Sequence, residues 1–329
     1  MKVQHIIGAD LSKGSIDLVC HLLKSYIKIE NTVTGFKDLI KWMQQQKINP
    51  SETMIVMEHT GLYSYCFERF LHKQQIAFCK VNALEIKRSI GIVRGKTDKL
   101  DATRIACYGY EKKDKLTIDV PASEALKRLQ MLHSSRERLV RHRSSLICAI
   151  KEYKHIGISD KDVIVQSQLQ LIKGFDKQIE KLMIEIETII KGQKSLKQNF
   201  CLLQSIGGVG KVVALVTIIK THNFTRFADA RKFACFCGTA PFEHSSGTSI
   251  RKKTRVSRIA DKKMKSLLNL SAMSAIQNDK ELREYYLKRN EAGKSKMSTI
   301  NIVRNKIIYR MFAVIKRQTP FVENYLQVA

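Results

Sequence analysis

An unbroken three–four spacing of apolar residues through the middle of the chain is the feature that most restricts its fold. The spacing runs through Ile172, Phe175, Ile179, Leu182, Ile186 and Ile189. An earlier stretch follows the same pattern in Leu129, Leu132, Leu139, Leu146 and Ile150. Apolar residues with this heptad spacing line one side of a helix and drive it onto a second helix. The pattern predicts two long helices that pack as a coiled-coil hairpin or between subunits.

Two arginines, Arg136 and Arg143, fill seam positions of the first of these helices. A buried seam accepts arginine only if the guanidinium reaches solvent or finds a partner. An ordinary helical spacer would carry the same pattern, but the arginines favour an oligomerisation stalk. We therefore expect residues 118–195 to form a coiled-coil helical region, through which the chain assembles as a homo-oligomer, a dimer or a tetramer.

The segment before this region, residues 1–117, alternates strand-like and helix-like patterns. Three apolar strands separated by short turns are followed by a helical stretch that contains the only tryptophan, Trp42. A strand, a helix, a further strand and a last helix complete the segment. This order predicts an α/β domain with a mixed sheet covered by helices, with Trp42 in its core.

The segment after the heptads, residues 196–329, has a mostly helical pattern. Two apolar helical stretches flank the turn Gly207-Gly208-Val209-Gly210, and Lys211 follows the turn. Such a turn resembles a helix–hairpin–helix, in which Gly208, Gly210 and the adjoining backbone N–H groups approach a phosphate. A plain corner between two helices is the alternative. A loop rich in Pro, Ser and Gly, a basic run and further helices complete the segment.

The charge of the chain points to its partner. The 329 residues include 58 Lys and Arg against 30 Asp and Glu, a formal net charge of +28. A polyanion such as DNA or RNA is the expected partner, because basic side chains that meet phosphates release condensed counterions. Between residues 251 and 265 the basic side chains outnumber the single acid, Asp261; we expect phosphate contacts from Arg251, Lys252, Lys253, Arg255, Arg258, Lys262 and Lys263.

Membrane and metal–thiolate classes are disfavoured. The sequence has no apolar run of about 18 residues and no signal-peptide pattern at its start, so we expect a cytoplasmic protein that binds no membrane. The eight cysteines are scattered, and Cys235 and Cys237 lack a second pair at zinc spacing. Reduced core thiols are the expected state.

Four carboxylates are the candidates for chemistry. Asp10 and Glu58 close two apolar strand runs, and Asp98 and Asp101 stand three residues apart on a helical stretch. Strand-end carboxylates of neighbouring parallel strands meet at one edge of a sheet, and four of them together repel one another unless a cation lies between them. Mg²⁺, or Mn²⁺, prefers such oxygen ligands and clamps the attacking and leaving oxygens of a phosphoryl transfer.

Basic residues beside the second acidic pair, Arg94, Lys96 and Lys99, are expected to meet the phosphates of the substrate. The structural alternative treats each acid separately. Asp98 would be a helix N-cap, Asp101 a first-turn acid that favours the helix dipole, and Asp10 and Glu58 turn residues.

The residues carry a resemblance to a known family. The segments "GADLSKGSIDL", "VMEHTGLY" and "GKTDKLDATRIA" resemble the RuvC-like DEDD domain of the insertion sequence 110 family of transposases, relatives of the Piv DNA invertase. The later stretch from "LLQSIGGVGK" to "IADKKMKSLL" is similar to the C-terminal transposase domain of that family. The resemblance implies an RNase H-like, RuvC-like DEDD catalytic domain over residues 1–117 and a transposase domain over residues 196–329.

What the resemblance implies for mechanism is specific. The family's four acids fall on Asp10, Glu58, Asp98 and Asp101, and its essential serine falls on Ser246, in the pattern Pro241-x-x-x-x-Ser246-Gly247. That serine is expected to attack the DNA phosphate and to leave a covalent protein–DNA link. The acids of a neighbouring subunit complete the site with their metal. A non-coding RNA encoded by the element itself is expected to choose donor and target DNA.

Several alternatives stay open around the serine. Ser245 and Ser249 are neighbours that compete for the role of nucleophile, and His244 is two residues away as a possible base, although a solvent-facing role is favoured. The alternative function is a RuvC-like nuclease or junction resolvase in which water, activated by metal, cuts DNA. A nucleic-acid-binding protein without catalysis is a third reading, and the intact set of four acids argues against it.

Overall fold

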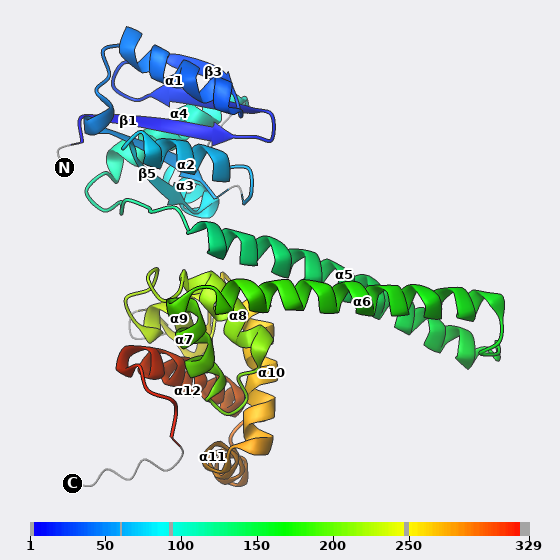
Figure 1. The fold of residues 1–329 in the computed structure, drawn as a ribbon. Coiled ribbons are helices and arrows are strands. Elements are labelled where there is room, and N and C mark those ends of the chain that lie inside the picture. Colours follow the sequence, from blue (N-terminus) through cyan, green and yellow to red (C-terminus); the bar gives the residue numbers. More distant parts are fainter. Residues whose placement is uncertain (1–2, 60, 92–94, 247–249, 323–329) are drawn as a thin grey trace. The chain divides into compact units, whose positions relative to one another are not determined.

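The computed structural model describes residues 3–59, 61–91, 95–246 and 250–322. The chain forms two compact units, an N-terminal unit, Met1–Pro121, and a C-terminal unit, Ala122–Ala329 (Figure 1). No helix of the described residues is both long enough and apolar enough to cross a membrane.

The N-terminal unit contains a five-stranded mixed sheet in the order β3-β2-β1-β4-β5. The strands β1, β2 and β3 are joined by short turns and pair antiparallel, whereas β1, β4 and β5 pair parallel. This is the mixed sheet that the sequence predicts. The strands are β1 His5–Leu11, β2 Ser15–Cys20, β3 Tyr26–Glu30, β4 Thr53–Glu58 and β5 Ala77–Val81.

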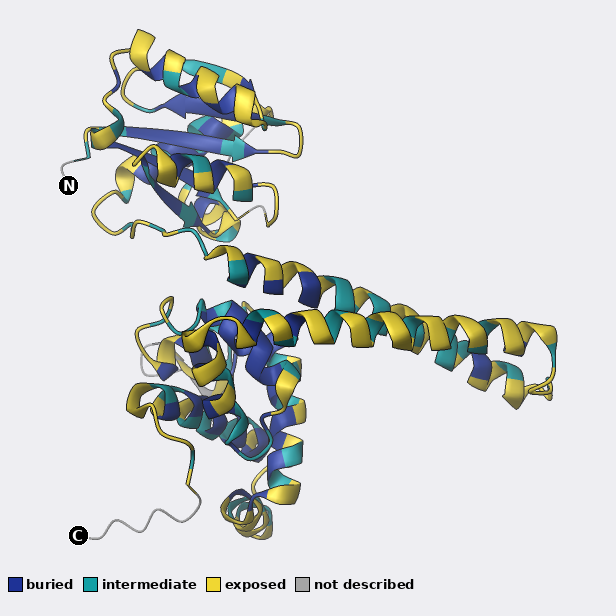
Figure 2. Ribbon diagram, in the orientation of Figure 1, coloured by how far each residue is buried: buried dark blue, intermediate teal, exposed yellow. Residues whose placement is uncertain are grey.

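Helices cover both faces of this sheet, and the alternation of strand side chains decides which residues meet which helices. Odd-numbered residues of β1 pack with residues of α1 (Val33–Gln45) and α2 (Tyr65–Lys73), among them the predicted core residue Trp42. Ile6 and its neighbours Met54 and Val56 pack on the opposite face with α3 (Ala83–Ser89) and α4 (Asp98–Glu111). Figure 2 shows the strands buried between exposed outer helix faces. A short 3-10 turn, Pro50–Glu52, leads into β4.

Two glycines let α4 approach the sheet closely. A Cβ atom on Gly8 would lie 2.2 Å from the carbonyl oxygen of Ala102 and 2.3 Å from the amide nitrogen of Ala106. A Cβ atom on Gly109 would lie 2.7 Å from Val56 and 2.8 Å from Ile6. Because α4 therefore passes over Ile6 near its end and over Gly8 earlier, its first turn lies toward the carboxyl end of β1.

In its described residues the C-terminal unit consists of helices and one β-hairpin, and one cluster of buried side chains joins the helices. Its first two helices pack against each other within the chain. The elements are α5 Glu124–His155, α6 Val163–Lys191, α7 Lys194–Gln204, α8 Lys211–Thr221, α9 Ala230–Phe236, β6 Pro241–Ser246, β7 Ile250–Val256, α10 Lys262–Asn278, α11 Lys280–Glu291 and α12 Lys296–Arg317.

The long helices α5 and α6 form the hairpin that the heptad spacing predicts as one of its two outcomes. Burial along the seam is uneven: Leu129 and Ile186 are buried, whereas Phe175 and Leu146 are only half-buried. Arg143 reaches across the seam, where its Nε lies 2.5 Å from Oδ1 of Asp176. The seam arginine is thus accommodated by pairing, as expected for a charged residue in an apolar contact.

One strand pair was not predicted from the sequence, and one expectation needs correction. Ile250–Val256, the first part of the basic run, forms a strand that pairs antiparallel with Pro241–Ser246. The cysteines are not all core thiols: Cys20, Cys79 and Cys237 are buried, but Cys66, Cys148 and Cys201 are exposed.

Candidate active site

Four charged residues form one row across the sheet on the face that α4 covers. Lys28 of β3 lies opposite Asp17 of β2, and Asp17 lies opposite Asp10 of β1. Ala9 pairs with Met57 in the parallel register, so Asp10 and Glu58 are the next neighbours along β1 and β4. Since residues opposite each other in a sheet project to the same side, all four side chains belong to the α4 face.

The first turn of α4 brings the remaining two acids to this row. Thr97 is the N-cap of the helix, and its hydroxyl accepts a hydrogen bond of 3.2 Å from the amide of Leu100. The capping role that the structural alternative gave to Asp98 therefore belongs to Thr97. Asp98 and Asp101 occupy the first turn, where carboxylates also favour the helix dipole.

The charges of the acids act on one another. Burial first, and then the charges of Asp101, Glu58, Asp98 and Asp17 in that order, together raise the pKa of Asp10 from 3.8 to about 6. Burial and the charge of Asp101 raise the pKa of Glu58 as well. Like charges close together make ionisation costly, which is the condition that a bound cation relieves.

Asp98 and Asp101 each have a cationic partner in the structure. Nζ of Lys28 lies 3.7 Å from Asp98, and Arg104 donates a 2.6 Å bond to Asp101 and a 2.9 Å bond to the carbonyl oxygen of Gly95. Among the described residues, no hydrogen bond or ion pair is made by the side chains of Asp10 and Glu58.

A divalent cation fits the chemistry of this donor set, because hard cations take carboxylate oxygens. In the described part of the chain, however, no three or more Asp, Glu, His or Cys side chains already lie in positions to hold an ion together. Asp98 and Asp101 point to Lys28 and Arg104 instead. A cation would have to draw these two side chains away from their partners toward Asp10 and Glu58.

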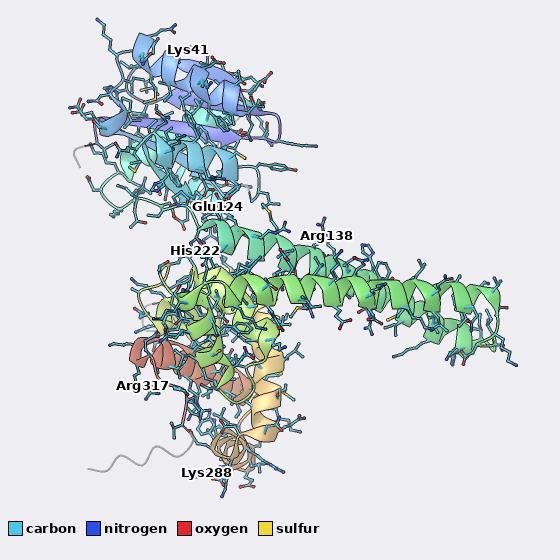
Figure 3. The ribbon with its side chains drawn as sticks, viewed as in Figure 1. Lys41, Glu124, Arg138, His222, Lys288 and Arg317 are labelled. Atoms are coloured by element: carbon cyan, nitrogen blue, oxygen red, sulfur yellow. The ribbon has the colours of Figure 1, made fainter. Side chains whose placement is uncertain are left out.

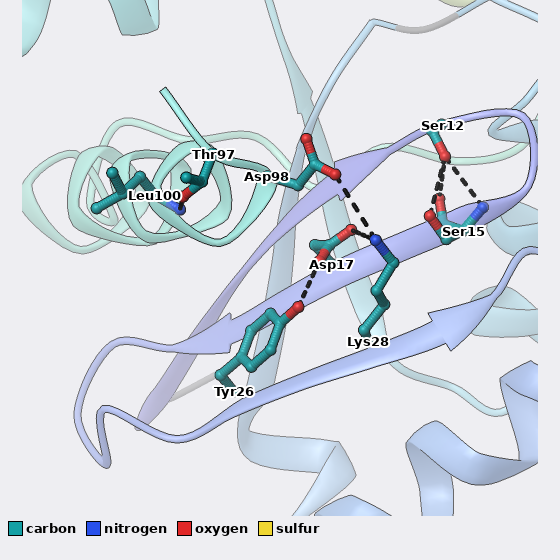
Figure 4. Close-up of polar contacts among 8 residues, drawn as sticks. All are labelled: Ser12, Ser15, Asp17, Tyr26, Lys28, Thr97, Asp98 and Leu100. Carbon is teal, nitrogen blue, oxygen red and sulfur yellow. Dashed lines mark hydrogen bonds and ion pairs between the residues drawn. The ribbon is translucent and has the colours of Figure 1, made fainter. Parts of the chain in front are cut away.

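The sequence did not single out Asp17, a fifth acid beside the four. Asp17 is only 3% exposed, accepts a 2.6 Å hydrogen bond from the hydroxyl of Tyr26 and lies 3.6 Å from Nζ of Lys28 (Figure 4). The bond to Asp17 raises the pKa of Tyr26 to about 12, so the hydroxyl stays a donor. The signal in the sequence was an aspartate at an inward position of an otherwise apolar strand, SIDLVC.

The candidate serine lies at the end of the β6–β7 hairpin. In the antiparallel register Ser246 is paired with Ile250, Ser245 with Arg251 and His244 with Lys252. Ser245 is exposed. The side chains of His244, Ser246, Arg251, Lys252 and Lys253, together with Arg94 and Ser249, lie outside what the structure describes.

The remaining basic candidates differ in whether their side chains already contact other residues. Lys96, Lys99, Arg255, Arg258 and Lys262 are exposed. Nζ of Lys99 lies 5.0 Å from the centre of the Tyr26 ring. Lys211 and Lys263 are each 2.7 Å from a glutamate, Glu187 and Glu137 respectively. A phosphate would have to compete with those two acids.

The glycine turn lies between the helices α7 and α8, as the apolar periodicity predicts. Gly208 has a φ of +84°, and a Cβ atom there would lie 2.4 Å from the carbonyl oxygen of Ser271 on α10. Gly210 is the N-cap of α8 without a side-chain cap, and open space surrounds it. A hollow of about 400 Å³ lies at this turn, lined by residues 204–210 and Ser274. The exposed N–H groups at the start of α8 suit an anion.

Known proteins resemble the chain over almost its full length. Residues 7–153 match the DEDD model of IS110 transposases, described as "Transposase", and residues 201–287 match the model described as "Transposase IS116/IS110/IS902 family". The pilin gene-inverting protein of Moraxella bovis is 27% identical over 321 residues, which cover 96% of this chain and 97% of that protein.

Two further relatives are a second pilin gene-inverting protein and a protein of an IS110 element. The pilin gene-inverting protein of Moraxella lacunata is also 27% identical, with the same coverage. The insertion element IS110 uncharacterized 43.6 kDa protein of Streptomyces coelicolor is 26% identical over 163 residues, which cover 50% of this chain and 39% of that protein. The two matched regions contain the row of acids and the serine hairpin, respectively.

Proposed function

Because the chain belongs to the IS110 family of transposases and is a DNA recombinase or transposase, we propose that it mobilises its own insertion element by metal-assisted cleavage and rejoining of DNA, with Ser246 as the nucleophile. The observation that carries the proposal is the row of acids on the α4 face, with a half-buried Asp10 whose pKa is raised by its acidic neighbours. A catalytic carboxylate cluster shifts pKa values in this way.

Asp10, Glu58, Asp98 and Asp101 would hold the cation, Mg²⁺ or Mn²⁺. The cation, when bound, would neutralise charge on the phosphodiester and favour loss of the proton from an attacking hydroxyl. The chain's own part is to keep Asp10 and Glu58 fixed on adjacent strands while α4 supplies Asp98 and Asp101. Rigid strands and a helix held by backbone contact position such ligands more narrowly than loops do.

In the proposed reaction the Ser246 oxygen forms a bond to phosphorus, and the bond from phosphorus to one sugar oxygen breaks. The serine proton passes to a base and the departing sugar oxygen gains a proton, so a serine phosphodiester and a free DNA hydroxyl result. A hydroxyl of a second DNA end then attacks that ester and releases Ser246, which completes strand exchange. The acids of a neighbouring subunit complete this site in the proposed assembly.

The second candidate is a RuvC-like nuclease or junction resolvase that uses water. It is favoured by one observation: the acids all belong to a compact unit that ends at Pro121, so hydrolysis would need no residue from the C-terminal unit. In that case Ser246 would be structural.

Suicide DNA carrying a nick beside the cleavage point separates the two candidates, because it traps a covalent intermediate. We expect a protein–DNA adduct with the native chain and with Ser245→Ala, and none with Ser246→Ala. Ser245→Ala is the matched control, since it removes a hydroxyl from the neighbouring residue of the same strand. Strand exchange at the native rate by Ser246→Ala would reject the serine mechanism.

A loss of reaction in Asp10→Ala with unchanged DNA binding would exclude a protein that only binds nucleic acid. Native strand exchange by Asp10→Ala would instead reject the acidic site.

Further parts of the proposal follow from the family and the charge of +28. They are a guide RNA encoded by the element, assembly into a dimer or tetramer through α5 and α6, and work in the cytoplasm at the nucleoid. We also propose an RNase H-like fold for residues 1–117, a coiled coil for 118–195 and a transposase domain for 196–329.

A further inference from the structure

Lys28 has the position of a built-in counter-cation in the row of acids. It lies on β3, directly opposite Asp17, on the face of the sheet that carries Asp10 and Glu58. Its Nζ is 3.6 Å from Asp17 and 3.7 Å from Asp98, so one ammonium group joins β2 to the first turn of α4 (Figure 4).

The two contacts of Lys28 differ in their surroundings. The side chain of Asp17 is 4% exposed, and that of Asp98 is 66% exposed. A buried carboxylate needs its partner, whereas an exposed ion pair contributes little because water and salt screen it. Asp17, which Tyr26 also binds, therefore anchors the ammonium, and Asp98 is the side chain that can leave.

We propose that Lys28 is a positioning residue: it holds Asp98 away from the strand acids and competes with the divalent cation for that carboxylate. The inference rests on the proposed metal site and assigns a role that the four acids alone do not supply. When Asp98 turns toward Asp10 and Glu58, Lys28 keeps Asp17 as its partner, so no buried charge is left unpaired. Lys28 thus sets how readily the site takes a cation.

The sign of the effect follows from charge. Removing the ammonium group releases Asp98 from its ion pair. It also removes one positive charge from the surroundings of the divalent cation. Both changes favour a divalent cation, so Lys28→Met should bind Mn²⁺ more tightly, by about three- to tenfold for a partly solvated charge at this separation. A residue that merely supported the fold would weaken binding or leave it unchanged.

The experiment measures Mn²⁺ affinity of the full chain by titration calorimetry, with no DNA present. Lys41→Met is the matched control, because Lys41 is an exposed lysine on α1 (Figure 3), at the opposite face of the sheet, paired with Asp38 at 3.1 Å. We expect Lys41→Met to bind as the native chain does and Lys28→Arg to stay close to it. An unchanged or weaker affinity in Lys28→Met, or an equal gain in Lys41→Met, would overturn the proposal.

A second measurement tests whether Lys28 acts through Asp98. In an Asp98→Asn background, Lys28→Met should lose most of its gain, since no carboxylate remains to be released. A gain of unchanged size in that background would contradict the proposed competition. If Lys28→Met alone does not fold, the double variant Asp17→Asn with Lys28→Met removes both members of the buried pair, and the same gain is expected.

Failure of the metal site itself gives a different result. A native chain that binds no Mn²⁺, or whose binding survives in Asp10→Asn, would refute the metal part of the proposed function and this inference with it. Binding that depends on Asp10 but not on Lys28 would refute the inference alone.

Discussion

In the N-terminal unit the candidate acids sit on strands and a helix whose backbones touch, whereas in the C-terminal unit Ser246 lies on a hairpin of which no described residue belongs to the core. The first arrangement fixes the acids through strand register and close packing. In the second, the described support of Ser246 is the pairing of its strand β6 with β7.

The largest expected effect on stability comes from Gly8→Ala, which disrupts the close packing of α4 on the sheet of the N-terminal unit. The new Cβ atom would meet backbone atoms of α4 at 2.2 and 2.3 Å, so the helix must shift, at a cost of about 3 kcal/mol or more in the free energy of unfolding. Urea unfolding followed by the fluorescence of Trp42 reports on this unit. Gly14→Ala, where a Cβ atom meets nothing within 4 Å, should cost about 0.5 kcal/mol or less.

Gly208→Ala is the counterpart in the C-terminal unit. Alanine must adopt the φ of +84° and place its Cβ atom 2.4 Å from Ser271, so we expect a loss of about 2–3 kcal/mol. The helical signal in circular dichroism should shift, while the Trp42 transition stays in place. Gly210→Ala, which has open space around it, is the control. A joint shift of both signals would show that the two units do not unfold independently.

Asp10→Asn should change the stability of the N-terminal unit in a way that depends on pH. The folded-state pKa of Asp10, about 6 against an ordinary 3.8, means that its ionisation opposes folding. The stabilising contribution of the protonated Asp10 carboxyl group is fully present below about pH 4 and is lost as the pH rises through 6. With EDTA present, Asp10→Asn should therefore raise the free energy of unfolding of the N-terminal unit at pH 7 by about 1–2 kcal/mol, a figure reduced for the partial exposure of the side chain, and hardly change it at pH 4. An equal effect at both pH values would contradict the raised pKa.

The smallest effect concerns the basic surface near the hairpin. Replacing Arg258 and Lys262 by glutamine should lower the slope of log affinity for DNA against log salt by about 2, because two fewer phosphates are neutralised. Replacement of Lys288 and Arg317, exposed on α11 and α12 (Figure 3), removes the same charge elsewhere. An equal fall in slope for both pairs would remove any special role for the surface next to the serine.

The sequence predicted the N-terminal unit well, because apolar alternation and strand-end acids are local signals. Asp10, Glu58, Asp98 and Asp101 needed only their position in strands or in a first helical turn. The places of Asp17 and Lys28 beside Asp10 were missed because they depend on which residues face each other across β1, β2 and β3. Register of that kind is set by three strands together and is not visible in any one of them.

The C-terminal unit was predicted less completely. The helices on either side of the glycine turn were predicted from their apolar periodicity. The basic residues of Ile250–Val256 concealed a strand, since a run of Arg and Lys resembles a solvated loop until its partner strand is known. The choice between an intramolecular hairpin and a contact between subunits could not be made from heptads, because the same spacing serves both.

The length of the α5–α6 hairpin determines how far the chain extends along the axes of these two helices. Helix α6 has 29 residues, which at about 1.5 Å per residue extend over roughly 44 Å. Along a duplex with a rise of about 3.4 Å per base pair, that span corresponds to roughly 13 base pairs, more than one turn. Ile186 and Ile190 near the end of α6 belong to the helical core, so the connection between α5 and α6 lies somewhat less than this full span from the core.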